Sequence, residues 1–208
     1  MVRAVILGTG DESHALCHLF KNYNTASSGN YLEVTKPSIQ KGGKTLHETG
    51  VLISELHDSL ARANIVILAI PAKALRTFVS DHLQILKDKI LVDVSNSWTR
   101  GEDLNSILSM TDVRFVKAFN DLGAVDLLLD KPTSKDKIQT KVCSKYSDAA
   151  DAVKGFAEES LGLDVKLIPY ERYSDIAQHQ QSLGENWIKA AILIVVVFAI
   201  AELYAILR

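Results

Sequence analysis

Two glycines near the amino terminus are spaced as in a turn that binds phosphate groups. Residues 2–7 form a short apolar run, and Gly8-Thr9-Gly10-Asp11-Glu12-Ser13 follows directly. Apolar residues then recur at helical spacing. An apolar strand, a glycine turn and a helix open a dinucleotide-binding βαβ unit, in which N–H groups at the start of the helix bind a pyrophosphate. Ser13 stands where the usual pattern has its third glycine.

The end of the second predicted strand bears on which dinucleotide would bind. Residues 31–35 have the pattern of a strand that runs into Thr35-Lys36. At this point an acidic residue binds the ribose 2′-OH of NAD, whereas a basic or hydroxyl residue accommodates the 2′-phosphate of NADP. Thr35 and Lys36 therefore favour NADP(H). Glu33 is the alternative, because it would serve as an NAD-type acid if the strand ended two residues earlier.

Later apolar runs also end in groups that could contact a ligand. Pro71 ends the run over residues 65–70, and two further strands are predicted over residues 89–94 and 113–118. Ligands of open α/β sheets bind at the carboxyl ends of the strands. The candidate contacts at these ends are Ala69, Ile70, Pro71, Ser95, Asn96, Ala118, Phe119 and Asn120. The sequence shows no Ser-His-Asp, Cys-His or metal-ligand cluster, so it predicts neither a catalytic side chain nor a metal site.

The order of the predicted elements indicates the fold class. Strands and helices alternate over about the first 170 residues, which predicts an α/β fold with a doubly wound parallel sheet. Leu52, Leu56 and Leu60 predict a helix over residues 51–63. We expect a Rossmann-like nucleotide-binding domain over residues 1–170 and a linker or short helix over residues 171–186.

The last part of the chain has the composition of a membrane span. Residues 190–207 are apolar apart from Tyr204 and the charged Glu202. As a helix, this segment would extend about 27 Å, close to the roughly 30 Å of a bilayer core. Trp187, Lys189 and Arg208 flank it as interfacial anchors would. A single transmembrane helix over residues 187–208 is the favoured interpretation, and a buried helix of a soluble or oligomeric protein is the alternative.

Composition and charge exclude several classes of protein. The chain has 208 residues, a formal net charge of −2 and 47% hydrophobic residues. This balance allows a sizeable core and does not suggest nucleic-acid binding. Two cysteines, Cys17 and Cys143, are far apart in the sequence, which favours a reducing compartment over a disulfide framework.

Three motifs together resemble a known family. They are the Gly8 turn, residues 89–96 and residues 116–120, and they are similar to the F420H2:NADP+ oxidoreductase-like domain, in particular the amino-terminal domain of the STEAP metalloreductases. The resemblance covers about residues 2–170. It implies NADP(H) as the cofactor, bound by Thr9, Gly10, Asp11 and Glu12 at the pyrophosphate, by Thr35 and Lys36 at the 2′-phosphate, and by Ala69, Ile70, Pro71, Asn96, Ala118, Phe119 and Asn120 along the nicotinamide side. Gly8 and Ser13 of the same turn are further candidate cofactor contacts.

The resemblance also implies a reaction and a location. In that family NADPH passes a hydride to a flavin, a membrane haem takes the electrons onward, and Fe(III) or Cu(II) is reduced outside the cytosol. Residues 187–208 fall where the membrane domain of the family begins, which implies an endosomal or plasma membrane with the nucleotide domain in the cytosol. We expect no haem site in the 208 residues, and Val125, in place of a flavin-contacting tryptophan, leaves FAD binding open.

The sequence is consistent with three alternative functions. The first is an NADPH-dependent, metalloreductase-like oxidoreductase that forms homo-oligomers or hetero-oligomers with haem-containing metalloreductase subunits. The second is a non-catalytic NADP-binding module that regulates or assembles with such enzymes. The third is a soluble reductase of a small organic substrate, with the apolar tail as an oligomerisation helix.

Overall fold

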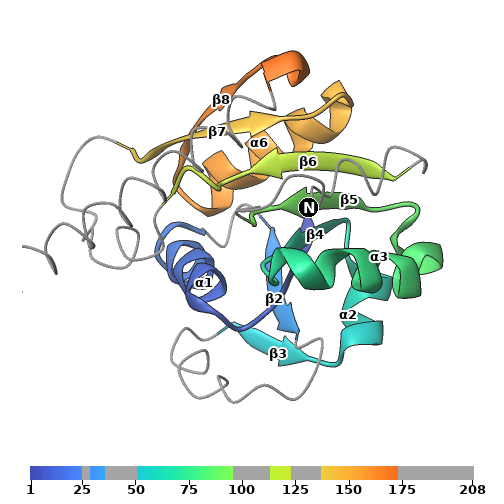
Figure 1. Cartoon of the computed structure of the whole chain (residues 1–208). Helices are drawn as coiled ribbons and strands as arrows, with labels where there is room; N and C mark the ends of the chain where they lie inside the picture. Colours follow the sequence, from blue (N-terminus) through green and yellow to red (C-terminus); the bar gives the residue numbers. More distant parts are fainter. Residues whose placement is uncertain (25–28, 36–50, 96–112, 123–136, 173–208) are drawn as a thin grey trace, which may run out of the picture. The chain divides into compact units, whose positions relative to one another are not determined.

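The computed structural model describes residues 1–24, 29–35, 51–95, 113–122 and 137–172 (Figure 1). The chain divides into two compact units, Met1–Tyr173 and Ser174–Arg208. All described residues lie in the first unit, so the predicted membrane helix over residues 187–208 lies outside them, as does most of the predicted linker. Within the described part of the chain, no helix is long and apolar enough to cross a bilayer.

The described strands form one eight-stranded sheet in the order β3-β2-β1-β4-β5-β6-β7-β8. Their bounds are β1 Arg3–Leu7, β2 Tyr31–Thr35, β3 Leu52–Ser54, β4 Ile65–Leu68, β5 Ile90–Asp93, β6 Arg114–Ala118, β7 Gln139–Cys143 and β8 Asp164–Leu167. The first six strands are parallel, in the order of a dinucleotide-binding fold. This agrees with the predicted α/β class.

Helices cover both faces of the sheet. The helix α1 (Asp11–Tyr23) contacts α6 (Ser147–Ser160), while α2 (Leu56–Arg62) contacts α3 (Ala72–Leu86). Figure 1 shows α1 and α3 on opposite sides of the sheet. A short 3₁₀ helix, Tyr170–Arg172, follows β8. The arrangement leaves the carboxyl ends of the parallel strands along one edge.

The core lies between the central strands and these helices. β4 and β5 are buried at every position, as expected of parallel strands covered on both faces. The largest fully buried side chains are Phe119, Phe156, Ile6, Leu7, Leu16, Leu60, Ile65, Ile67, Leu68, Leu75 and Leu86. Burial of this apolar surface is the main favourable term in folding.

Two predictions of secondary structure are wrong. The leucine spacing predicts one helix over residues 51–63, but Leu52–Ser54 forms β3 beside β2, and α2 begins only at Leu56. The sheet is also not entirely parallel, because β7 runs antiparallel to β6. Both differences arise from strand pairing, which depends on residues distant in sequence.

Candidate functional site

The predicted strand ends lie in one row across the sheet. Thr35 pairs with Leu7, Leu7 with Leu68, Leu68 with Asp93, and Asp93 with Lys117. The residues that follow these positions therefore leave the sheet at the same edge. The row crosses between β1 and β4, where the strand order reverses and where ligands of such sheets bind.

Gly8 is required by the fold itself. Its N–H donates to the Thr35 carbonyl at 3.1 Å, and the Ala69 N–H donates to the Leu7 carbonyl at 3.0 Å, so the turn is tied to β2 and β4. Its φ is +131°, and a Cβ here would lie 2.2 Å from the Ala69 carbonyl oxygen. A residue with a side chain would clash with the backbone and be strained.

Gly10 differs from Gly8, because the fold does not require a glycine there. It precedes α1 with φ −84° and ψ −173°, a conformation that any residue adopts. No heavy atom of the described residues lies within 4 Å of the place where its Cβ would be. A glycine also cannot cap the first N–H groups of the helix with a side chain. The place beside Gly10 therefore suits a phosphate group bound by backbone N–H groups.

Buried hydroxyl groups accompany this turn. Ser13 and Thr35 are both fully buried. Among the described residues, neither hydroxyl oxygen has a hydrogen-bond partner. A buried polar group without a partner costs free energy, so such groups often mark a ligand or water position. Ser13 is small enough to pack where the usual pattern has its third glycine.

Two carboxylates occupy the first turn of α1. Asp11 is exposed, whereas Glu12 is half-buried. Burial, with a smaller contribution from the charge of Asp11, raises the pKa of Glu12 to about 7. Glu12 therefore changes charge near neutral pH beside the place that suits a phosphate.

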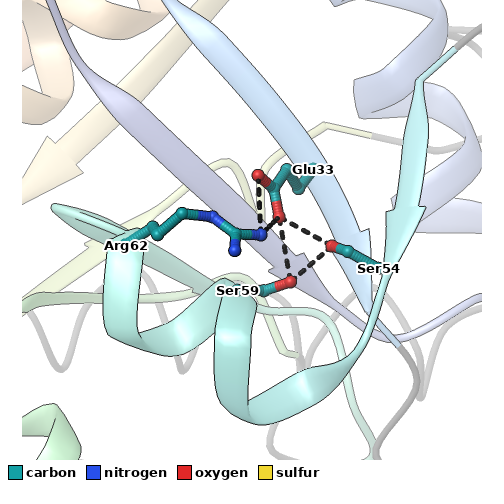
Figure 2. Close-up of polar contacts among 4 residues, drawn as sticks. All are labelled: Glu33, Ser54, Ser59 and Arg62. Atoms are coloured by element: carbon teal, nitrogen blue, oxygen red, sulfur yellow. Dashed lines mark hydrogen bonds and ion pairs between the residues drawn. The ribbon is translucent and has the colours of Figure 1, made fainter.

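Glu33 does not lie at a strand end, and its carboxylate is held by protein groups (Figure 2). β2 continues to Thr35, so the condition for an NAD-type acid is not met. Glu33 accepts hydrogen bonds from Ser54 at 2.6 Å and Ser59 at 2.9 Å, and pairs with Arg62 at 3.1 Å. Burial opposes its charged form, but these bonds outweigh burial and hold the pKa of Glu33 below its ordinary value. The cluster joins β2, β3 and α2.

A buried ion pair at the ends of β5 and β6 is absent from the sequence prediction. Lys117 Nζ lies 2.9 Å from Asp93 Oδ2, and both side chains are only 3% exposed. Lys117 also donates to the Ser95 carbonyl, and the Ser95 N–H donates to Asp93 Oδ1 at 2.8 Å. A signal was available, because Asp93 and Lys117 are opposite charges at matching points of two apolar strands. Charges that deep are expected to pair.

The turn after β6 has a strained backbone. Phe119 has a φ of 63° and a side chain that is 1% exposed. A bulky residue in the left-handed region is uncommon, and such strain concentrates at functional sites. Ala118 and Asn120 beside it are buried as well. The strained turn thus fixes three of the predicted contact residues at the sheet edge.

The remaining predicted contacts divide between described and undescribed residues. Thr9 and Ala69 are half-buried, Ile70 is buried and Pro71 is exposed at the start of α3. Lys36, Asn96 and Val125 lie outside the described residues. The structure therefore brings Gly8, Thr35 and Ala69 together directly and places the other described contacts along the same edge.

No metal centre or reactive thiol is found within the described ranges. They contain no group of three or more His, Cys, Asp or Glu side chains that could hold a metal ion. Cys17 and Cys143 are free and buried, and burial raises their thiol pKa values to about 12 and about 11. Such thiols do not form thiolates at neutral pH.

Comparison with known proteins agrees with this architecture. Residues 3–97 match the model of the family NADP oxidoreductase coenzyme F420-dependent. No curated protein matches the chain significantly.

Several solved structures share the fold. A protein of Arthrobacter sp. FB24 assigned as an F420-dependent NADP-reductase has 18% identity and a TM-score of 0.64, with 91% of this chain and 93% of that chain covered. Plasmodium falciparum pyrroline carboxylate reductase, solved with NADP bound, has 16% identity and a TM-score of 0.62, with 92% and 66% covered. A Bacillus cereus imine reductase has 15% identity and a TM-score of 0.64, with 92% and 63% covered.

Proposed function

We propose that this chain is an NADP(H)-dependent oxidoreductase domain that transfers a hydride between the nicotinamide and a flavin or deazaflavin. The observation that carries the proposal is the free space beside Gly10. No described atom lies where a Cβ would be, and the backbone conformation there would accept any residue. Gly10 lies beside the point of strand reversal, in a segment that matches an NADP-dependent oxidoreductase family. Direct titration of the purified chain with NADPH tests the proposal.

The residues of the chain would hold and orient the dinucleotide. Backbone N–H groups between Gly10 and Ser13 would bind the pyrophosphate at the start of α1. Thr35 and the following Lys36 would take the 2′-phosphate, and the ends of β4, β5 and β6 would border the nicotinamide. Bound NADPH supplies the hydride. Hydride transfer between two cofactors depends mainly on positioning, so it does not require an acid, a base or a nucleophile from the protein.

Changing Lys36 to glutamate is expected to reverse the preference between NADPH and NADH. The wild-type protein should bind NADPH more tightly, because a cation and a hydroxyl attract the 2′-phosphate. A carboxylate repels that phosphate and accepts a hydrogen bond from the free 2′-OH of NADH. Loss of one charge-assisted hydrogen bond corresponds to about a 10- to 100-fold weaker affinity for NADPH. Calorimetric titration with both nucleotides measures the change.

Glu33→Gln is the matched control for this prediction. Because the Glu33 carboxylate is held by Ser54, Ser59 and Arg62, its neutralisation should lower stability and leave the nucleotide preference unchanged. Equal affinity of the wild-type protein for NADPH and NADH would contradict the assignment of NADP. A change of preference in Glu33→Gln would instead favour Glu33 as the residue that reads the ribose.

NADPH affinity is expected to fall as the pH rises through about 7, because of Glu12. A bound pyrophosphate repels the Glu12 carboxylate and raises its pKa further, so binding takes up a proton. Affinity is then highest where Glu12 is protonated and decreases by up to about tenfold per pH unit above its free pKa. Titrations from pH 6 to pH 9 should show this decrease in the wild-type protein. In Glu12→Gln it should be smaller and affinity at high pH should be greater.

The comparison with Glu12→Gln is needed because the 2′-phosphate itself titrates near pH 6. Subtracting the variant's profile removes that contribution. Asp11→Asn is the matched control: Asp11 is the exposed neighbour of Glu12, and its variant should keep the decrease. Identical profiles for the wild type and Glu12→Gln would show that Glu12 does not face the bound phosphates.

The electron acceptor separates the finer alternatives. The resemblance to STEAP metalloreductases supports a membrane-attached domain that would transfer a hydride from NADPH to a flavin. The reduced flavin would then release a proton and pass its two electrons one at a time, through the haem of a partner subunit, to two Fe(III) or Cu(II) ions. NADPH oxidation should then be stimulated by added flavin and a ferric chelate. Binding of NADPH without turnover under these conditions would favour a non-catalytic regulatory module. Carbonate extraction of membranes containing the chain tests whether residues 187–208 anchor it.

A further inference from the structure

At the ends of β5 and β6, the side chains of Asp93 and Lys117 form a set of hydrogen bonds with each other and with the backbone of Ser95. Lys117 donates to Asp93 at 2.9 Å and to the Ser95 carbonyl, while the Ser95 N–H donates to the other oxygen of Asp93 at 2.8 Å. Both backbone groups of Ser95 are therefore bound. Its side-chain hydroxyl oxygen is buried and, within the described part of the chain, has no hydrogen-bond partner.

Stability of the turn alone does not explain this arrangement, because several of its features cost free energy. A buried ion pair carries a desolvation penalty and is often no more stabilising than apolar residues of the same size. A buried hydroxyl without a partner adds a further cost. The strained backbone of Phe119 lies two residues beyond Lys117, at the same edge of the sheet. Because these three unfavourable features lie at the same edge of the sheet, we expect the Ser95 hydroxyl to have a hydrogen-bond partner outside the described residues.

The position of the set indicates what that partner is. In a doubly wound sheet the two halves flank the point of strand reversal, and each binds one half of the dinucleotide. Thr35, at the end of β2, belongs to the half that reads the adenosine ribose. Asp93 and Lys117 lie in the same register row but beyond β4, on the other half.

We infer that the Asp93–Lys117 pair fixes the turn at Ser95 so that the Ser95 hydroxyl hydrogen-bonds the nicotinamide riboside of the dinucleotide. The inference rests on the proposed function, since it assigns new roles within the same NADP(H) site. Ser95 is a binding residue in this account. Asp93 and Lys117 are positioning residues that act through Ser95 and do not touch the ligand.

The test compares a whole dinucleotide with its adenosine half. NADPH and 2′,5′-ADP are titrated separately into the full chain and into Ser95→Ala, which keeps both backbone groups of Ser95. We expect the variant to bind NADPH about tenfold more weakly, the effect of one lost hydrogen bond, and to bind 2′,5′-ADP as the wild type does. Ser144→Ala is the matched control, because that hydroxyl donates to the Phe115 carbonyl, near the amino end of β6. It should leave both affinities unchanged.

The double variant Asp93→Asn with Lys117→Met tests the positioning role. It removes both charges together, so no unpaired charge stays buried, and the amide oxygen introduced by Asp93→Asn can still accept from the Ser95 N–H. We expect the same selective loss of NADPH affinity as in Ser95→Ala. If Ser95→Ala weakens the binding of NADPH and 2′,5′-ADP equally, or weakens neither, the binding role of Ser95 is overturned. The same result in the double variant overturns the positioning role of Asp93 and Lys117. If the wild-type chain binds neither ligand, the proposed function itself fails, which is a different result.

Discussion

Replacing Gly10 with valine is expected to weaken NADPH binding at least about 100-fold and to leave the domain folded. The backbone conformation at Gly10 is open to any residue, and the place of its Cβ is free of described atoms, so the side chain meets no protein group. The valine side chain would instead occupy the space in which we propose that the pyrophosphate binds. Loss of two hydrogen bonds of about 1.5 kcal/mol each lowers affinity about 100-fold or more. Calorimetric titration measures the loss, and circular dichroism checks the fold.

Gly8→Ala is the informative contrast to this variant. The added Cβ would lie 2.2 Å from the Ala69 carbonyl oxygen, at a φ of +131°. We expect the free energy of unfolding to fall by at least about 2 kcal/mol, since strain and a backbone clash add together. Urea unfolding should therefore separate a glycine that the fold needs from a glycine that the ligand needs. Undiminished NADPH binding by Gly10→Val would remove the main support for the proposed function.

Replacing Lys117 alone with methionine strongly destabilises the domain. It leaves the Asp93 carboxylate buried without its cation, and removal of one partner of a buried pair costs about 3–5 kcal/mol. The loss is a large fraction of the roughly 5–15 kcal/mol that holds a typical domain folded. Urea unfolding followed by circular dichroism should show a lower midpoint with a similar slope.

Two further variants show whether burial causes that loss. Adding Asp93→Asn to Lys117→Met should recover part of the stability, because no charge is then left unpaired. Lys141→Met removes the cation of a partly exposed pair between Lys141 on β7 and Asp121 in the turn after β6, where the separation is 3.9 Å. Such pairs are worth about 0–1 kcal/mol, so the midpoint should hardly change. An equal loss in Lys117→Met and Lys141→Met would contradict the account.

Much of the fold follows from local sequence patterns. The apolar runs at β4 and β5 are long enough and continuous enough to identify buried parallel strands, and the Gly8 turn identifies the first crossover. Local patterns fail at the edges of the sheet. β3 has three residues and is a strand because it pairs with β2, whereas its leucine fits a helical repeat equally well. The antiparallel direction of β7 is likewise a property of its pairing with β6 and not of its own residues.

The candidate site divides in the same way. The glycine turn and the strand ends follow from residue types and from the rule that ligands bind at the carboxyl ends of strands. The Asp93–Lys117 pair requires the register of β5 against β6, which no single motif contains. The engagement of Glu33 by Ser54, Ser59 and Arg62 depends on how α2 packs beside β2. Sequence therefore identifies which residues are candidates, and pairing decides which of them are already occupied.

The left-handed backbone at Phe119 has a consequence for the speed and selectivity of binding. Strain of this kind, about 1–3 kcal/mol, is sustained by the packing of the buried ring, so the turn holds its shape before a ligand arrives. A preformed turn loses little conformational entropy on association, and encounter need not wait for a loop to rearrange. The end of β6 thus behaves as a rigid template. On the proposed function, such a template would suit the constant shape of a single cofactor.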